Sequence, residues 1–350
     1  MNRKKTEKTK ILYPFVFSDY GYENEIIVQR IKKQPDAIVV INKQGPLSEL
    51  FDKAGISYFI LPLKKMITPR TFYPVVLWRL VSSSLSLFRF VREVGPFKAL
   101  FFHDLTTALC WSGTTKMGRI PYIVSMSKLE AFSKYATIVL SDASFLLCPC
   151  PFIKESTPGR FHQKMFVVPF VPSFKNILPA EIRRSKKRSF KDKNNKSIEQ
   201  TFVIMTDALH NDDRVVRFAS VLELETGQKT GLLHTDDYKT GKELSVALAG
   251  CHLFLGVKSF NLDPFALFAA MRAEVPVFSV RQGLYMDVIS DGESGVFFKD
   301  DTNMTENAVQ TAEFFKNVTA VDTLKKTAAE QVEIIYQKTL DFMKKLYDSI

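Results

Sequence analysis

The sequence has few cysteines and no long apolar run. Only four of its 350 residues are cysteine, namely Cys110, Cys148, Cys150 and Cys251. The Cys-Pro-Cys triplet is one residue shorter than the Cys-x-x-Cys pattern of redox and zinc sites, and no histidine stands near it at ligand spacing. This scarcity excludes a disulfide scaffold. It predicts buried, reduced thiols in a cytoplasmic protein and no bound metal.

No segment offers the roughly 18 consecutive apolar residues of a membrane-spanning helix, so we expect none. The first ten residues are basic, but a strand follows them rather than a long apolar core, so we expect no signal peptide. What the sequence does contain is ordinary for a globular protein, with 46% hydrophobic and 24% charged residues. A length of 350 residues favours two domains.

Positive charge exceeds negative charge along the chain. Lys and Arg number 48 against 37 Asp and Glu, which gives a net charge of +11 and favours anionic partners such as phosphates or acidic lipid surfaces. The most basic stretch, 183–196, holds eight bases and one acid. Phe190 is its single aromatic residue and it carries no base-reading motif, so a solvated linker is favoured over a nucleic-acid contact, and no nucleic-acid partner is expected.

Short apolar runs alternate with amphipathic helices in both halves of the chain. The expected strands are 11–17, 37–41, 58–61, 99–102, 122–125, 136–140, 165–168, 202–205, 229–233, 252–256 and 275–278. The expected helices are 23–33, 47–54, 105–117, 214–223, 242–249, 265–273 and 321–347. This alternation is typical of parallel sheets covered on both faces, which bind ligands at the carboxyl ends of their strands.

One segment, 256–298, carries a specific set of motifs. They are Asp263-Pro264-Phe265, then Met271, Pro276-Val277, Gly283, Asp287 and Asp291-Gly292-Glu293-Ser294-Gly295. The segment resembles the donor half of family 4 glycosyltransferases, which have the GT-B fold, and from residue 270 to 298 the match runs without a gap. The N-terminal half agrees through Gly21, Gly45-Pro46-Leu47, Ala54-Gly55-Ile56, His103-Asp104 and Arg119-Ile120-Pro121-Tyr122.

The resemblance implies a GT-B-like α/β fold in which two Rossmann-like, doubly wound domains face a central cleft. An acceptor-side domain is expected over 1–175, a basic linker or loop over 176–200 and a donor-side domain over 201–325. A C-terminal helix, 326–350, is expected to return to the first domain. The implied reaction is retaining transfer of a sugar from a nucleotide-sugar to a glycan or lipid acceptor, with no cofactor or metal.

The resemblance also assigns residues to the site. Donor and phosphate binding falls to Arg214, Asn261, Asp263, Gly283 and Asp287, an acceptor loop to Gly21 and Tyr22, and His103 is a candidate catalytic residue. Each has a plainer interpretation. Arg214 fits a solvent-facing residue, Asp263 a helix N-cap and His103 a structural histidine. Gly283 fits a tight turn.

The donor motif is degenerate, which leaves the function open. The family's two glutamates are replaced by Asn261 and Ala269, or in another register only Asp263 remains. The family's Gly-Arg-Leu after strand 202–205 is absent, and the strand that normally ends in His ends in Ser125-Met126-Ser127-Lys128. Three functions therefore remain: a glycosyltransferase, a catalytically inactive partner or scaffold of an active glycosyltransferase, and a membrane-surface anion-binding protein.

A membrane surface is suggested by residues 72–92. This stretch is mostly apolar, contains Trp78 and is punctuated by Arg79, Arg89 and Arg92. Such a helix suits the interface of an anionic leaflet, and the alternative is a helix buried between a sheet and its neighbours. The expected localisation is the cytoplasm, with peripheral attachment to the inner face of the membrane in the first case.

Overall fold

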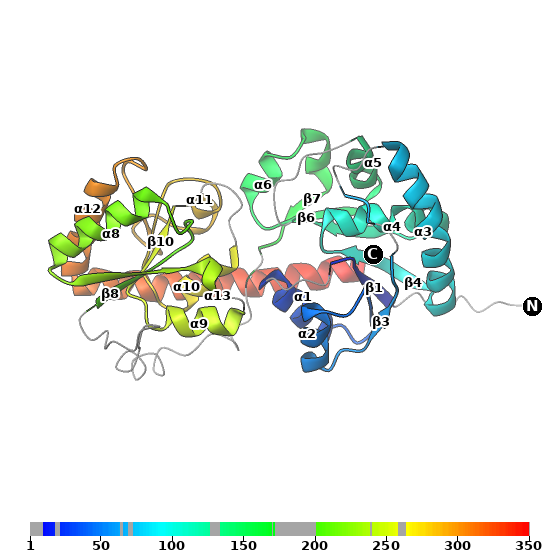
Figure 1. The fold of residues 1–350 in the computed structure, drawn as a ribbon, viewed down its shortest axis with the longest axis horizontal. Coiled ribbons are helices and arrows are strands. Elements are labelled where there is room, and N and C mark those ends of the chain that lie inside the picture. The colour runs from blue at the N-terminus through cyan, green and yellow to red at the C-terminus, as the bar shows by residue number, and fades with distance from the viewer. Residues whose placement is uncertain are drawn as a thin grey trace, which may run out of the picture. The chain divides into compact units, whose positions relative to one another are not determined.

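A computed structural model describes residues 10–17, 22–63, 66–68, 73–126, 134–169, 171, 201–238, 240–257 and 264–349. The chain divides into two compact units (Figure 1). Unit 1 comprises Met1–Val168 and Phe342–Ile350, and unit 2 comprises Pro169–Asp341. Each unit is built around its own parallel sheet.

The described part of unit 1 contains a seven-stranded parallel sheet in the order β3-β2-β1-β4-β5-β6-β7. The strands are β1 (Lys10–Phe15), β2 (Ala37–Ile41), β3 (Tyr58–Ile60), β4 (Phe97–Phe102), β5 (Tyr122–Ser125), β6 (Phe145–Cys148) and β7 (Met165–Val167). The order reverses between β1 and β4. This topological switch point is where doubly wound sheets open a crevice at their carboxyl edge.

Helices connect the strands of unit 1. They are α1 (Tyr22–Lys32), α2 (Pro46–Ala54), α3 (Tyr73–Val94), α4 (Leu105–Gly118), α5 (Lys134–Asp142), α6 (Pro151–Glu155) and the short 3-10 helix η1 (Gly159–Lys164). Successive β4 residues Leu100, Phe101 and Phe102 are all fully buried. Because neighbouring strand residues point to opposite faces, this shows that the sheet is covered on both sides.

The described part of unit 2 contains a five-stranded parallel sheet in the order β12-β11-β10-β8-β9. Its strands are β8 (Thr201–Thr206), β9 (Lys229–His234), β10 (Leu253–Gly256), β11 (Val277–Ser279) and β12 (Val296–Phe297). Its helices are α8 (Asp213–Thr226), η3 (Thr235–Asp237), α9 (Gly241–Leu248), α10 (Pro264–Arg272), α11 (Leu284–Val288) and α12 (Met304–Lys316). The order reverses between β8 and β10, which defines a second switch point.

The last helix, α13 (Val318–Ser349), begins in unit 2, and its final residues belong to unit 1. There Met343, Leu346 and Tyr347 join the hydrophobic core formed by β1, β2, α1 and α2. The Tyr13 hydroxyl donates to the Tyr347 hydroxyl across 3.1 Å, and Lys98 Nζ donates to the Tyr347 carbonyl across 2.6 Å. The end of the chain is therefore an integral part of the unit 1 core.

The Asp-Gly-Glu-Ser-Gly motif forms a tight turn before β12. Gly292 has a φ of 77° and its N–H donates to the Gly295 carbonyl across 2.8 Å. A Cβ on Gly295 would lie 2.7 Å from the Ile289 side chain, so only glycine fits there. The Asp291 carboxylate accepts from the Phe297 N–H across 3.0 Å and from the Arg281 guanidinium. These contacts fix the turn that leads into β12, the strand at the edge of the unit 2 sheet.

One secondary-structure element expected from the sequence is wrong. Residues 136–140, expected as a strand, lie within helix α5. The run is short and rich in β-branched residues, which favours a strand by propensity. Burial follows the helical spacing instead, because Ala136, Val139 and Leu140 are buried while Ile138 is exposed. The strand that lies between β5 and β7 in the sheet is β6. Neither β6 nor α12 is among the elements expected from the sequence.

The two doubly wound α/β units confirm the expected Rossmann-like organisation. The predicted linker 176–200 and the basic stretch 183–196 fall outside the described residues, and the domain boundaries stay predictions. Across the ranges that the structure describes, no helix combines the length and the apolar character needed to cross a bilayer.

Candidate functional site

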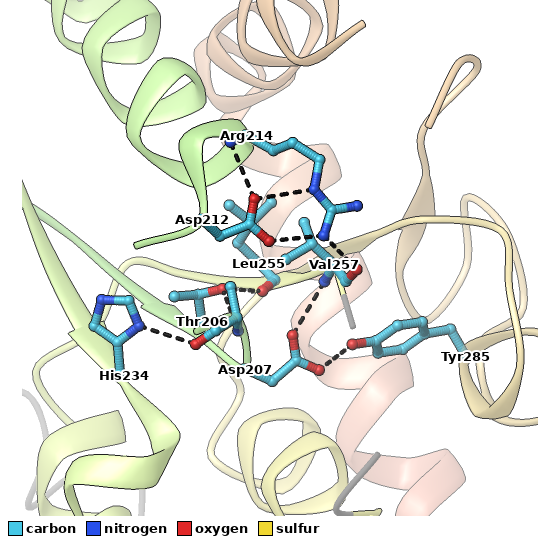
Figure 2. A network of polar contacts seen from close by, with 9 residues as sticks. Thr206, Asp207, Asp212, Arg214, His234, Leu255, Val257 and Tyr285 are labelled. Carbon is cyan, nitrogen blue, oxygen red and sulfur yellow. Dashed lines mark hydrogen bonds and ion pairs between the residues drawn. The ribbon is translucent and has the colours of Figure 1, made fainter. Parts of the chain in front are cut away.

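The switch point of unit 2 holds a network of polar contacts (Figure 2). Asp207 follows β8 directly, and Val257 follows β10. The Asp207 carboxylate accepts from the Val257 N–H across 3.1 Å through Oδ1, and from the Tyr285 hydroxyl through Oδ2. Asp207 is buried, so each of these hydrogen bonds offsets part of the cost of removing its charge from water.

Tyr285 reaches Asp207 from helix α11, which is 78 residues further along the chain. Its ring packs against Gly256, where a Cβ would lie 2.6 Å from the ring. The helix begins after Gly283, whose φ of 53° and ψ of −131° are unfavourable for any residue with a side chain. Gly256 and Gly283 thus allow Tyr285 to lie beneath the end of β10.

Arg214 lies in the first turn of α8, and its guanidinium points back toward the end of β10 (Figure 2). It makes a bidentate ion pair with Asp212: Nε to Oδ1 is 3.0 Å and Nη2 to Oδ2 is 2.7 Å. Nη2 also lies 3.4 Å from the Val257 carbonyl oxygen. The hydrogen bond from Arg214 holds the pKa of Asp212 below its usual range, and the same pair raises the pKa of Arg214.

Asp212 has a second task, because it is the N-cap of α8. Its carboxylate accepts from the Arg214 backbone N–H across 3.0 Å. The Asp212 side chain therefore receives both backbone and side-chain donors of one residue. This arrangement satisfies one of the orphan N–H groups at the helix start and fixes the direction of the guanidinium.

Two histidines lie beside this network at the ends of β8 and β9. The buried His234 donates through Nδ1 to the Ala208 carbonyl across 3.1 Å, and its ring centroid lies 4.1 Å from that of His210. His210 Nε2 lies 3.1 Å from Asp237 Oδ1. These contacts hold the loop that follows β8. Over the described ranges, no three His, Cys, Asp or Glu side chains are placed to hold a metal ion.

The switch point of unit 1 is lined by aromatic rings instead. His103 follows β4, and its ring stacks on Phe15 at 4.8 Å and on Tyr13 at 5.8 Å between centroids. Its Nε2 is buried and has no hydrogen-bond partner among the described residues. Burial, with a smaller contribution from the positive charge of Arg30, lowers the pKa of His103 well below its usual range. The imidazole is therefore neutral at neutral pH.

The structure places some of the predicted site residues and not others. Arg214 lies at the switch point of unit 2, and His103 at that of unit 1. Gly283 precedes α11, and Asp287 is an exposed residue of the same helix. Tyr22 begins α1. Gly21, Asn261 and Asp263 lie outside the described residues, so their expected roles stay predictions.

Asp207, Asp212 and Tyr285 are not among the site residues expected from the sequence. Asp207 could have been found, because a side chain that directly follows the first strand of a doubly wound domain lies at the switch point. Tyr285 gives no such signal, since its contact with Asp207 depends on how α11 is placed in three dimensions. The pairing of Asp212 with Arg214 is visible only in the geometry of the helix start.

A separate cavity of about 390 Å³ lies at the amino ends of the unit 2 strands. Its lining includes His252 and Pro276, which precede β10 and β11, together with Lys325 and Lys326 of α13. It is therefore remote from the carboxyl ends of the strands. The site described above does not include it.

The two doubly wound units give the expected GT-B-like fold. No family model matches the chain, and no curated protein has a significantly similar sequence. Solved structures are similar, however. A glycosyltransferase from Rickettsia africae ESF-5 has a TM-score of 0.72 at 10% identity, with 98% of each chain covered.

Two further structures show the same similarity. HepE from Anabaena, solved in complex with UDP-glucose, has a TM-score of 0.71 at 12% identity, covering 96% of this chain and 99% of HepE. Sucrose-phosphate synthase from Thermosynechococcus elongatus has a TM-score of 0.66 at 13% identity, covering 98% of this chain and 99% of the synthase. At these identities the comparisons establish the fold, which confirms that expectation.

Proposed function

We propose that this protein is a glycosyltransferase that transfers a sugar from a nucleotide-sugar to a glycan or lipid acceptor. The observation that carries the proposal is the position of Arg214 at the switch point of unit 2, where doubly wound domains bind nucleotides. The fold shared with a glycosyltransferase and with HepE, which was solved with UDP-glucose, gives independent support.

The chemistry of sugar transfer explains why a guanidinium matters there. The bond between the anomeric carbon and the diphosphate breaks, the acceptor's hydroxyl oxygen takes its place on that carbon, and the hydroxyl proton passes to the departing phosphate oxygen. Negative charge develops on the leaving diphosphate, and a fixed cation close to it lowers the barrier. We assign this role to Arg214. The motifs of residues 256–298 extend the proposal to retaining, family 4 chemistry that requires neither metal nor cofactor.

The candidate catalytic residue is His103, at the switch point of unit 1. A neutral imidazole whose Nε2 meets no hydrogen-bond partner within the described ranges is chemically suited to a sugar hydroxyl. Burial shields that nitrogen from solvent in this conformation, so catalytic use of His103 stays a prediction. We also propose a place in the reducing cytoplasm, because the chain has only four cysteines and all of them are buried.

We further propose that helix α3 rests on an anionic membrane surface, which would bring a lipid acceptor within reach. Trp78 is 70% exposed, and Val75 and Leu85 are exposed with it. Arg89 and Arg92 are also exposed and fall on the same stripe at helical spacing. Exposed apolar residues beside arginines are typical of interfacial helices.

Vesicle sedimentation tests the membrane proposal. The chain should pellet with phosphatidylglycerol vesicles and not with phosphatidylcholine vesicles, and Trp78→Ser with Leu85→Ser should abolish pelleting. Leu224→Ser is the matched control, since Leu224 is 81% exposed on α8 in unit 2. Equal pelleting of the α3 variant and the control would contradict the proposal.

A donor screen tests the proposed activity. The purified full chain is incubated with UDP-, GDP- and ADP-sugars and a panel of glycan and lipid acceptors, and nucleoside diphosphate release is measured. Release with at least one donor, increased by an acceptor, is expected. No release with any donor, combined with stimulation of another glycosyltransferase by this chain, would favour the inactive-partner function.

A further inference from the structure

The anion-binding groups at the switch point of unit 2 are already engaged by the chain's own carboxylates. The Arg214 guanidinium faces Asp212 through two hydrogen bonds of 2.7 and 3.0 Å. The Val257 N–H, the backbone donor at the end of β10, faces Asp207 across 3.1 Å. A guanidinium and a backbone N–H are the kinds of donor that a diphosphate requires.

These carboxylates reproduce two features of a bound diphosphate. Asp212 offers two oxygens to the guanidinium in the fork geometry that a phosphate also uses. Asp207 contributes a second negative charge, and the charges of both residues act on Arg214 together with that of Asp301. A diphosphate entering this site would add further negative charge beside acids that already neutralise the cation.

We propose that Asp212 and Asp207, which we call the carboxylate clamp, are internal substitutes for the donor's diphosphate and set the nucleotide affinity of the site. This inference rests on the proposed function. Binding of a nucleoside diphosphate would require Arg214 to exchange Asp212 for a phosphate. Because Asp212 also caps α8, that exchange would couple donor binding to the first turn of the helix.

The two roles of Asp212, which are to cap α8 and to pair with Arg214, can be separated by substitution. Serine is a good N-cap but cannot pair with a guanidinium, so Asp212→Ser keeps the cap and frees Arg214. Asp207→Asn retains an oxygen for the Val257 N–H and an amide for the Tyr285 hydroxyl while it removes the charge. Asp213→Asn is the matched control, since Asp213 is an exposed acid of the same helix start.

The test is calorimetric titration of UDP, ADP, GDP and inorganic pyrophosphate into the full chain and its variants. We expect Asp212→Ser to tighten binding of at least one nucleotide roughly tenfold, the scale of a charge-assisted hydrogen bond. Asp207→Asn should tighten it several-fold and Asp213→Asn less than twofold. Adding Arg214→Ala to Asp212→Ser should cancel the gain.

The outcomes separate this inference from the proposed function. If the wild-type chain binds a nucleotide and Asp212→Ser binds it equally well, the carboxylate clamp is refuted and the proposed function stands. If no protein in the series binds any of the four ligands at millimolar concentration, both are refuted. Asp212→Asn, which preserves the shape of the side chain, replaces the serine variant if thermal unfolding shows that the latter is not folded.

Discussion

The two switch points of this molecule occupy equivalent places in their sheets and have opposite chemistry. In unit 1, between β1 and β4, a neutral His103 lies among aromatic rings with one nitrogen unpartnered among the described residues. In unit 2, between β8 and β10, acids, a guanidinium and a hydroxyl satisfy one another. The same topology therefore places mainly aromatic rings at the switch point of one unit and charged groups at that of the other.

The difference follows from the residues placed directly after each strand. His103 is followed by Asp104, which caps α4 as Asp212 caps α8, but whose carboxylate accepts from the N–H and the hydroxyl of Thr107 across 2.7 and 2.6 Å. Unit 2 instead places Asp207 at the strand end and Asp212 at the helix start. A doubly wound fold thus fixes where a site lies, whereas a few loop residues determine which ligand charge the site can bind.

The largest effect is expected from filling the space that Tyr285 occupies. Gly256→Ala places a methyl group 2.6–2.8 Å from three atoms of the Tyr285 side chain. Displacing a packed ring costs about 2–3 kcal/mol, so the free energy of unfolding of unit 2 should fall by that amount. Urea unfolding followed by circular dichroism measures it.

Two observations make this prediction specific. Both tryptophans, Trp78 and Trp111, lie in unit 1, so their fluorescence follows unit 1 alone and should be unchanged in Gly256→Ala. Gly159→Ala is the control, because nothing lies within 4 Å of the added Cβ. A shift in the fluorescence transition, or an equal loss in the control, would show that the steric argument is wrong.

Removing single hydroxyls tests the contrast between charged and neutral pairs. Tyr285→Phe leaves the buried Asp207 carboxylate without its hydroxyl donor, which should cost about 2 kcal/mol. Tyr13→Phe removes one member of a neutral hydroxyl pair in unit 1 and should cost about 1 kcal/mol. Urea unfolding of the two variants gives the comparison. Equal losses would mean that the carboxylate adds nothing to the unit 2 network.

The smallest effect concerns pH and unit 1. The pKa of His103 lies below its ordinary value of about 6.5, so below pH 6.5 the unfolded chain takes up a proton that the folded chain does not. Stability is therefore complete above pH 6.5 and is lost as the pH falls. Between pH 7.5 and 5.5 the wild type should lose more stability than His103→Gln, by roughly 1 kcal/mol. Tryptophan fluorescence in urea measures it, and identical pH profiles would contradict a depressed pKa.

The alternation of apolar runs and amphipathic helices was sufficient to predict both doubly wound units, because burial on both faces leaves a strong pattern in the strands. It also placed Arg214 at a helix start after a strand. It failed at residues 136–140, where packing overrides β propensity. The position of Asp207 at the switch point could be predicted, but its contacts with Val257 and Tyr285 could not, because they join residues 50 and 78 positions apart.

The most direct test of the account is whether Arg214 binds the diphosphate of a nucleotide. UDP is titrated by calorimetry into the wild type, Arg214→Ala and Arg217→Ala, the last being an exposed arginine one turn further along α8. The account predicts at least a roughly tenfold loss of affinity for Arg214→Ala, the scale of one charge-assisted contact, and less than a twofold change for Arg217→Ala. Equal affinity of the two variants would contradict it.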